Sequence, residues 1–134
     1  MGPGNEASPI LFFDRSVGTT IPRTLRRLKV PVGIEWHQAN FTRDVTDDEW
    51  LPEVGAKGWT VIGFDWSYHR NQAELAAIQQ YSMGVFYLWG VASQTWERTF
   101  CFARAYDRIV QAIHSTPRPF IYRVRRSGHL QKVL

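Results

Sequence analysis

Short apolar runs alternate with amphipathic segments along most of the chain. The runs at residues 10–13, 32–34, 59–64 and 85–88 are continuous and short, which is typical of buried strands. Segments with apolar residues at helical spacing lie between and after them, and predict helices over about 21–30, 51–58, 72–81 and 94–114. This alternation favours an α/β fold with a mostly parallel central sheet of about four strands between two helical layers.

The two ends of the chain differ from this pattern. Residues 1–9 are polar, contain Gly and Pro, and are predicted to be a flexible leader. Residues 120–124 and 130–133 are strand-like and flank a Ser127-Gly128 turn signal, so they predict a C-terminal β-hairpin. We therefore expect a single three-layer domain over residues 10–134.

Pro52 complicates the segment around residue 50. Thr46 and Glu49 have the spacing of a capping box at a helix start. Because proline inside a helix removes a backbone donor, we expect a tight turn over residues 47–50, with the regular helix beginning near Leu51 and ending at Gly58. Residues 38–45 before it are expected to form a loop.

The charge of the chain is unevenly distributed. Lys and Arg total 16 and Asp and Glu total 12, and no acidic residue follows position 117. A basic C-terminal segment suits a phosphate backbone, although charges on an edge strand also keep that strand soluble. Arg123, Arg125 and Arg126 are our candidate RNA contacts.

Other classes of protein lack support in the sequence. Cys101 is the single cysteine, which excludes an intrachain disulfide, and its apolar helical setting predicts a buried thiol. No stretch approaches the ~20 apolar residues of a membrane span, and we expect a cytoplasmic protein without membrane contact. Zinc-type His and Cys spacings, phosphate-binding glycine loops and a GxSxG nucleophile motif are missing.

Acidic residues stand where two predicted strands end. Asp14 and Asp65 follow such strands, and Asp47 and Asp48 open the segment that leads into the second of them. Ligand sites of open parallel sheets lie beyond the carboxyl ends of the strands. Carboxylates gathered there need a cation, and Mg²⁺ or Mn²⁺ suits an all-oxygen site. The same residues could instead cap helices or lie in solvated loops, and spacing alone leaves both interpretations open.

His69 and Arg70 follow Asp65 closely. Arg70 could hold a phosphate and His69 could transfer a proton. The alternative is an exposed polar loop in front of Asn71, which is placed to cap the next helix.

The sequence resembles the compact PIN-like domains, in particular the VapC-type toxin ribonucleases of bacterial toxin–antitoxin pairs. The resemblance spans about residues 10–131, with its pieces in the family's order. Those pieces are Phe12-Phe13-Asp14-Arg15, residues 47–55, residues 58–62, Asp65, Asn71 with Glu74, Pro119-Phe120-Ile121 and Ser127-Gly128.

This resemblance implies a hydrolase that binds Mg²⁺ or Mn²⁺ and cuts single-stranded or looped RNA. The positions that match the family's metal-binding and catalytic acids are Asp14, Asp47 and Asp65. Neighbours that would support the metal or the substrate are Asp48, Glu49, Arg15, His69 and Arg70. The implied partners are the RNA substrate, a cognate antitoxin that covers the acidic cleft, and a second copy in a homodimer.

The sequence also departs from the family pattern. Gly63-Phe64 stands where the family often places Thr and a basic residue, and no counterpart is evident for the early helical Glu of larger members. The alternative function is therefore a catalytically weakened PIN-like module that binds RNA or a protein partner without turnover. A phosphotransfer receiver-like domain would also gather aspartates, but no Lys ends a late strand.

Overall fold

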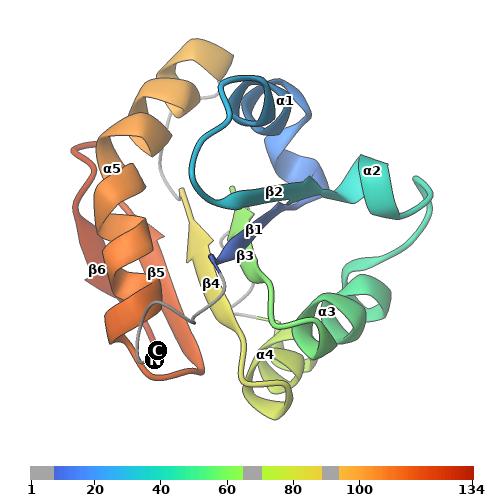
Figure 1. The fold of residues 1–134 in the computed structure, drawn as a ribbon. Helices are drawn as coiled ribbons and strands as arrows, with labels where there is room; N and C mark the ends of the chain where they lie inside the picture. The colour runs from blue at the N-terminus through green and yellow to red at the C-terminus, as the bar shows by residue number, and fades with distance from the viewer. Residues whose placement is uncertain (1–7, 65–70, 89–93) are drawn as a thin grey trace, which may run out of the picture.

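A computed structural model describes residues 8–64, 71–88 and 94–134 of the chain. Its strands and helices are arranged in three layers (Figure 1). In chain order the elements are β1 (Ile10–Phe13), η2 (Arg15–Val17), α1 (Thr20–Arg27), β2 (Gly33–Trp36), α2 (His37–Asn40), α3 (Asp47–Ala56), β3 (Thr60–Gly63), α4 (Gln72–Gln80), β4 (Gly84–Tyr87), α5 (Thr95–Ser115), β5 (Phe120–Val124) and β6 (Leu130–Lys132).

The strands form one sheet in the order β2-β1-β3-β4-β5-β6. Neighbours from β2 to β5 are parallel, whereas β6 is antiparallel to β5. The expected α/β fold with a C-terminal hairpin is confirmed. The hairpin is an integral part of the sheet, because β5 pairs with β4 from Gly84↔Phe120 to Tyr87↔Arg123.

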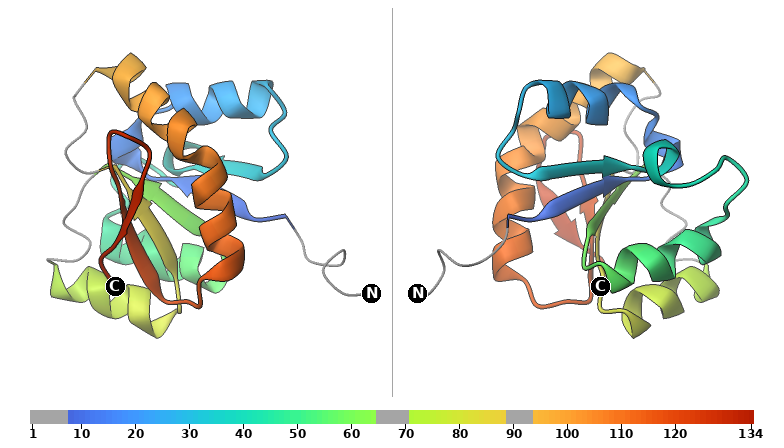
Figure 2. Two further views of the ribbon diagram at one scale, coloured as in Figure 1. Left: turned by 90° about the vertical axis from the view of Figure 1, so that its left-hand side faces the viewer. Right: turned by 45° about the vertical axis from the view of Figure 1, so that its right-hand side comes forward.

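Both faces of the sheet are apolar and each is covered by helices. Phe12, Val61, Val85 and Ile121 are register neighbours in one row across four strands. This row belongs to the core cluster formed with buried residues of α3 and α4, and the alternate strand residues pack with α1 and α5. Figures 1 and 2 show α1 and α5 on one side of the sheet and α3 and α4 on the other.

The structure corrects the expectation for Pro52. α3 is continuous from Asp47, with Pro52 inside it, so the expected separate turn at 47–50 is wrong. An internal proline costs a helix roughly 3 kcal/mol. Trp50, Leu51 and Val54 are almost fully buried, and burial stabilises each such side chain by roughly 1.5–3 kcal/mol, which offsets that cost.

The capping box before α3 and the glycine that ends it are as predicted, although the helix begins four residues before the expected Leu51. The Glu49 carboxylate accepts a 2.9 Å hydrogen bond from the Thr46 backbone N–H, as a capping box requires. At the other end Gly58 has φ +73°, and the Trp59 N–H donates to the Val54 carbonyl at 3.3 Å. This left-handed glycine ends the helix as a Schellman motif.

The structure also bears on the expected loop at 38–45, on Cys101 and on membrane-spanning helices. The expected loop at 38–45 begins with one helical turn, α2. Cys101 is buried as predicted, and burial raises the pKa of its thiol. Across the described ranges, every helix is too short or too polar to cross a membrane.

Candidate functional site

Asp14 lies at the carboxyl end of β1. Its backbone N–H donates to the Ile62 carbonyl at 3.0 Å, which continues the pairing of β1 with β3. The side chain is 4% exposed, and its Oδ1 accepts from the Ser16 backbone N–H at 2.8 Å and from the Ser16 hydroxyl. One oxygen of this carboxylate therefore caps η2, as one of the two sequence interpretations proposed.

Asp47 lies at the first position of α3 and is partly exposed. Its Oδ1 accepts a 3.0 Å hydrogen bond from the Trp50 indole N–H. Trp50 is buried, and its ring packs against Phe12 of β1 with 5.1 Å between centroids. The carboxylate is thus held in place by a side chain of the hydrophobic core.

A cavity of about 250 Å³ brings these two acids together. Its lining consists of Asp14, Arg15, Ser16 and Asp47. Carboxylate and hydroxyl oxygens are the donors that Mg²⁺ and Mn²⁺ prefer, and a site with few protein ligands leaves room for water and phosphate. The exposed Arg15 guanidinium adds a group suited to a phosphate oxygen. The residues present therefore fit a divalent ion.

A second polar cavity shares Asp47 with the first one. It measures about 380 Å³, and Asp47, Asp48, Asn71, Ala73 and Glu74 line it. Asp47 belongs to both cavities, so acidic groups extend from the end of β1 to the start of α4. Asn71 caps α4 as expected, with its side-chain oxygen accepting from the Ala73 and Glu74 N–H groups at 3.0 and 3.2 Å.

Glu74 was not among the predicted site residues. Its spacing from Asn71 indicated only a capping pair, whereas in the structure the side chain is buried and lines the cavity with Asp47 and Asp48. Burial of an acid is costly, so it is more common at sites that bind or react than on helix surfaces. The sequence carried no signal for this burial, because it arises from the packing of α4 against α3.

The structure describes only part of the predicted site. Asp65, His69 and Arg70 lie outside the described residues. Within the described ranges, no group of three or more His, Cys, Asp or Glu side chains is gathered closely enough to hold a metal ion. A metal site completed by Asp65 therefore stays a prediction.

The neighbours Asp48 and Glu49 have capping contacts. The Thr46 hydroxyl lies 2.6 Å from an Asp48 carboxylate oxygen and 2.8 Å from a Glu49 oxygen. Asp48 also lines the second cavity. A role for either residue beside the metal stays a prediction.

His37 is a second residue near the site for which the sequence carried no functional signal. It directly follows β2 and is 0% exposed, packed against Phe41 and Trp50 with centroid separations of 5.6 and 6.3 Å. The pKa of His37 is lowered from its ordinary value, chiefly because burial disfavours the charged ring. Arg15 also lowers the pKa, whereas the hydrogen bond to the Val45 carbonyl and the charge of Asp47 raise it. The ring thus lies within electrostatic reach of the acidic cavity, at the strand edge where ligand sites are expected.

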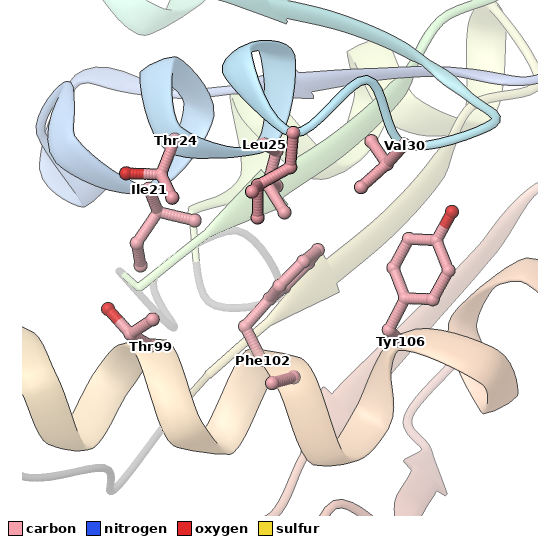
Figure 3. Close-up of a pocket in the computed structure, with 9 residues that line it drawn as sticks. Ile21, Thr24, Leu25, Val30, Thr99, Phe102 and Tyr106 are labelled. Atoms are coloured by element: carbon pink, nitrogen blue, oxygen red, sulfur yellow. The ribbon is translucent and has the colours of Figure 1, made fainter.

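An apolar cavity of about 300 Å³ lies between α1 and α5. Figure 3 shows Phe102 and Tyr106 of α5 facing Ile21, Leu25 and Val30 from the α1 side. Its lining contains no charged residue. This cavity is therefore chemically separate from the acidic site.

The C-terminal arginines have different surroundings. Arg125 and Arg126 are exposed, whereas Arg123 is half-buried on β5. Arg118 is also partly buried, and it donates to the Gly58 carbonyl at 3.1 Å and to the Thr60 hydroxyl at 2.7 Å. Burial also lowers the pKa of Arg118. Because its guanidinium is bound to Gly58 and Thr60, this arginine stabilises the fold and is not part of an exposed basic surface.

The chain matches a family described as "PIN like domain" over residues 9–90. This range runs from β1 past β4 and includes Asp14, Asp47 and Asp65. Searches of curated proteins and of solved structures find no match.

Proposed function

Because the chain belongs to the PIN-like domain family, whose members are generally metal-dependent nucleases, we propose that it is a metal-dependent endoribonuclease. The match covers more than half of the 134 residues. The observation that best supports the proposal is the cavity shared by Asp14 and Asp47. Two acids from distant parts of the sequence meet there at the carboxyl edge of the sheet.

Asp14, Asp47 and Asp65 would hold Mg²⁺ or Mn²⁺. A bound ion would supply an activated water and neutralise the charge on the attacking and leaving oxygens of a phosphodiester. The protein's own groups orient this site: Ser16 fixes the Asp14 carboxylate and Trp50 fixes that of Asp47. Arg15 would bind a non-bridging phosphate oxygen, and Arg70 and His69 are proposed to lie beside the substrate.

Single-stranded or looped RNA is the proposed substrate. The choice of RNA follows the resemblance to VapC-type toxins, and the exposed Arg125 and Arg126 supply positive charge for a phosphate backbone. Arg123 is proposed as a third contact from the adjacent strand.

We further propose that the protein is the toxin of a bacterial toxin–antitoxin pair and acts in the cytoplasm. A cognate antitoxin is proposed to cover the acidic cleft, as the resemblance to VapC-type toxins implies, and so to keep RNA away from Asp14 and Asp47. A homodimer is proposed from the family resemblance alone.

A second candidate function is a PIN-like module that binds RNA or a protein partner without turnover. The Phe64 ring lies 4.3 Å from the Arg98 guanidinium, at a position where the family often carries a basic residue. Gly63, beside it, also lacks the hydroxyl of the threonine that the family often carries, which takes an oxygen donor away from the proposed site. The loss of that oxygen favours weaker metal binding.

Cleavage of labelled single-stranded RNA in Mn²⁺, with and without EDTA, separates the two candidates. We expect metal-dependent cleavage that Asp14→Asn, Asp47→Asn and Asp65→Asn each reduce at least ~100-fold, because a metal ion contributes several kcal/mol to the transition state. Asp44→Asn is the matched control, since Asp44 is exposed and lines neither polar cavity. Cleavage that survives in all three variants would contradict the proposed site. RNA binding without cleavage would support the second candidate.

A further inference from the structure

An aromatic pair is exposed at the start of α5. Trp96 and Phe100 are 60% and 54% exposed, and their rings form an edge-to-face contact with 5.8 Å between centroids. They line an open hollow of about 470 Å³ with Thr20, Gln94, Thr95 and Thr99. Exposed apolar side chains that form a contiguous patch, as these two rings do, are more often sites of interaction than single exposed residues are.

Two arginines extend this pair along the same helix. Trp96, Phe100, Arg104 and Arg108 follow one another at four-residue intervals on α5. Residues at this spacing share one face of a helix, so the row extends over about 18 Å. Arg104 and Arg108 are both exposed.

The turn of the C-terminal hairpin lies against this row. The Arg104 guanidinium donates to the Arg126 carbonyl at 3.1 Å, and a Cβ on Gly128 would lie only 2.8 Å from Arg104 Cβ. Trp96, Phe100, Arg104 and Arg126 also line one hollow of about 120 Å³ together with Glu97. The aromatic pair and the hairpin turn therefore form one continuous surface.

The charge around this surface favours a polyanion. From residue 95 to the C-terminus the chain carries eight Lys and Arg residues, and its acids there are Glu97 and Asp107. A second copy docked face to face would bring like charges together, which is unfavourable at an interface. Single-stranded nucleic acid suits both the exposed aromatic pair and the positive charge, because its bases stack on aromatic rings and its phosphates pair with arginines.

The row begins close to the acidic site. The Phe64 N–H donates to the Ser16 hydroxyl at 3.1 Å, and the same hydroxyl donates to Asp14. Arg98 of α5 lies over the Phe64 ring, and Thr20 at the start of α1 shares the hollow of Trp96. Figure 1 shows the beginning of α5 next to α1.

We infer that Trp96, Phe100, Arg104, Arg108 and Arg126 form a binding surface for single-stranded RNA that leads toward the Asp14–Asp47 cavity. Bases stack on the two aromatic rings, and phosphates contact the three arginines. The choice of RNA over DNA rests on the proposed function. The stacking surface itself rests on the exposed side chains of α5 and the hairpin turn.

The test is binding of a fluorescein-labelled oligouridine by the full chain in EDTA, followed by fluorescence anisotropy. We expect Trp96→Ala and Phe100→Ala each to weaken binding roughly 5- to 150-fold, as loss of one stacked base does. Trp96→Phe should recover most of the affinity, because it restores a stacking ring. Arg104→Gln and Arg126→Gln should each reduce the slope of log affinity against log salt by about 0.7, the value per phosphate contact on a single strand.

Two control variants are matched to these changes. Leu28→Ala removes an exposed apolar side chain directly after α1, and Arg27→Gln removes an exposed arginine at the end of that helix. Both should leave affinity unchanged. Circular dichroism and the urea midpoint of each variant report whether it is folded.

Several outcomes would overturn the inference. They are an absence of RNA binding by the wild-type chain, equal affinity of a folded Trp96→Ala/Phe100→Ala double variant, or an equal loss in Leu28→Ala. A concentration-dependent dimer that the double variant abolishes would assign the surface to a second copy instead. Metal-dependent cleavage insensitive to Trp96 would overturn only this surface, whereas Trp96-dependent binding without cleavage would overturn only the nuclease.

Discussion

Asp47 accepts a 3.0 Å hydrogen bond from the indole N–H of Trp50, one turn further along α3. Asp47 lines both polar cavities, and Trp50 is buried in the core beneath them. The position of the acid is therefore coupled to the packing of the sheet, since Trp50 also contacts Phe12 of β1.

Replacing Trp50 with Phe tests this coupling. The substitution keeps an aromatic ring in the core but removes the donor to Asp47. We expect the free energy of unfolding to fall by about 1–2 kcal/mol and Mn²⁺ affinity to fall several-fold, because the carboxylate loses its orientation. Urea unfolding and isothermal titration with Mn²⁺ measure the two effects. Trp59→Phe, whose ring also packs against Phe12, is the matched control, and an equal loss of Mn²⁺ affinity there would contradict the expectation.

Metal binding should stabilise the fold through Asp14. A ligand at one hundred times its dissociation constant stabilises a protein by about 2.7 kcal/mol. We expect Mn²⁺ to raise the thermal midpoint of the wild-type chain and to leave that of Asp14→Asn unchanged. Without metal the two midpoints should be close, because an Asn side-chain oxygen can still accept from the Ser16 N–H. Equal stabilisation of both proteins by Mn²⁺ would place the ion elsewhere.

The sequence predicted most of the fold because its strands have a strong local signal. The apolar runs at 10–13 and 85–88 coincide closely with β1 and β4, and the turn at Ser127-Gly128 marked the hairpin. The continuity of α3 through Pro52 could not be predicted locally, since it depends on burial of Trp50 and Leu51 against strands far away in the chain.

Site residues could be predicted where they directly follow a strand, because ligand sites of parallel sheets lie beyond the carboxyl ends of the strands. Asp14 ends β1, so its position at the edge of the sheet was evident from the apolar run before it. His37 follows β2 in the same way, but the residues 32–34 that predicted this strand stopped short of it. Glu74 has no strand before it, and only the packing of α4 on α3 places it in the cavity.

His37 should make stability depend on pH. Burial lowers its pKa below 6.5, so the unfolded chain takes up a proton at a higher pH than the folded chain does. The free energy of unfolding should therefore fall as the pH drops below about 6.5, by up to about 1.4 kcal/mol per pH unit from this group. Urea midpoints of the wild type and His37→Leu at pH 7.5 and 5.0 measure the difference. An acid-induced loss that is equally large in His37→Leu would assign the effect to other groups.

Gly128 should be more sensitive to substitution than Gly18. Both have positive φ, +90° and +81°, so alanine is strained at either position by roughly 1–3 kcal/mol. A Cβ on Gly128 would also meet Arg104 at 2.8 Å, whereas a Cβ on Gly18 would have nothing within 4 Å. We expect Gly128→Ala to lower the urea midpoint more than Gly18→Ala. Equal midpoints would show that the hairpin turn can shift away from α5 without cost.

The position of β1 between β2 and β3 has a consequence for how the two acids move. Strands paired on both sides, with both faces covered, exchange their amide hydrogens only when the whole domain opens. Asp14 is attached to such a strand, and Asp47 is hydrogen-bonded to Trp50, whose ring packs against Phe12 of the same strand. The two carboxylates should therefore move together with β1, so an arriving cation would find their spacing already set.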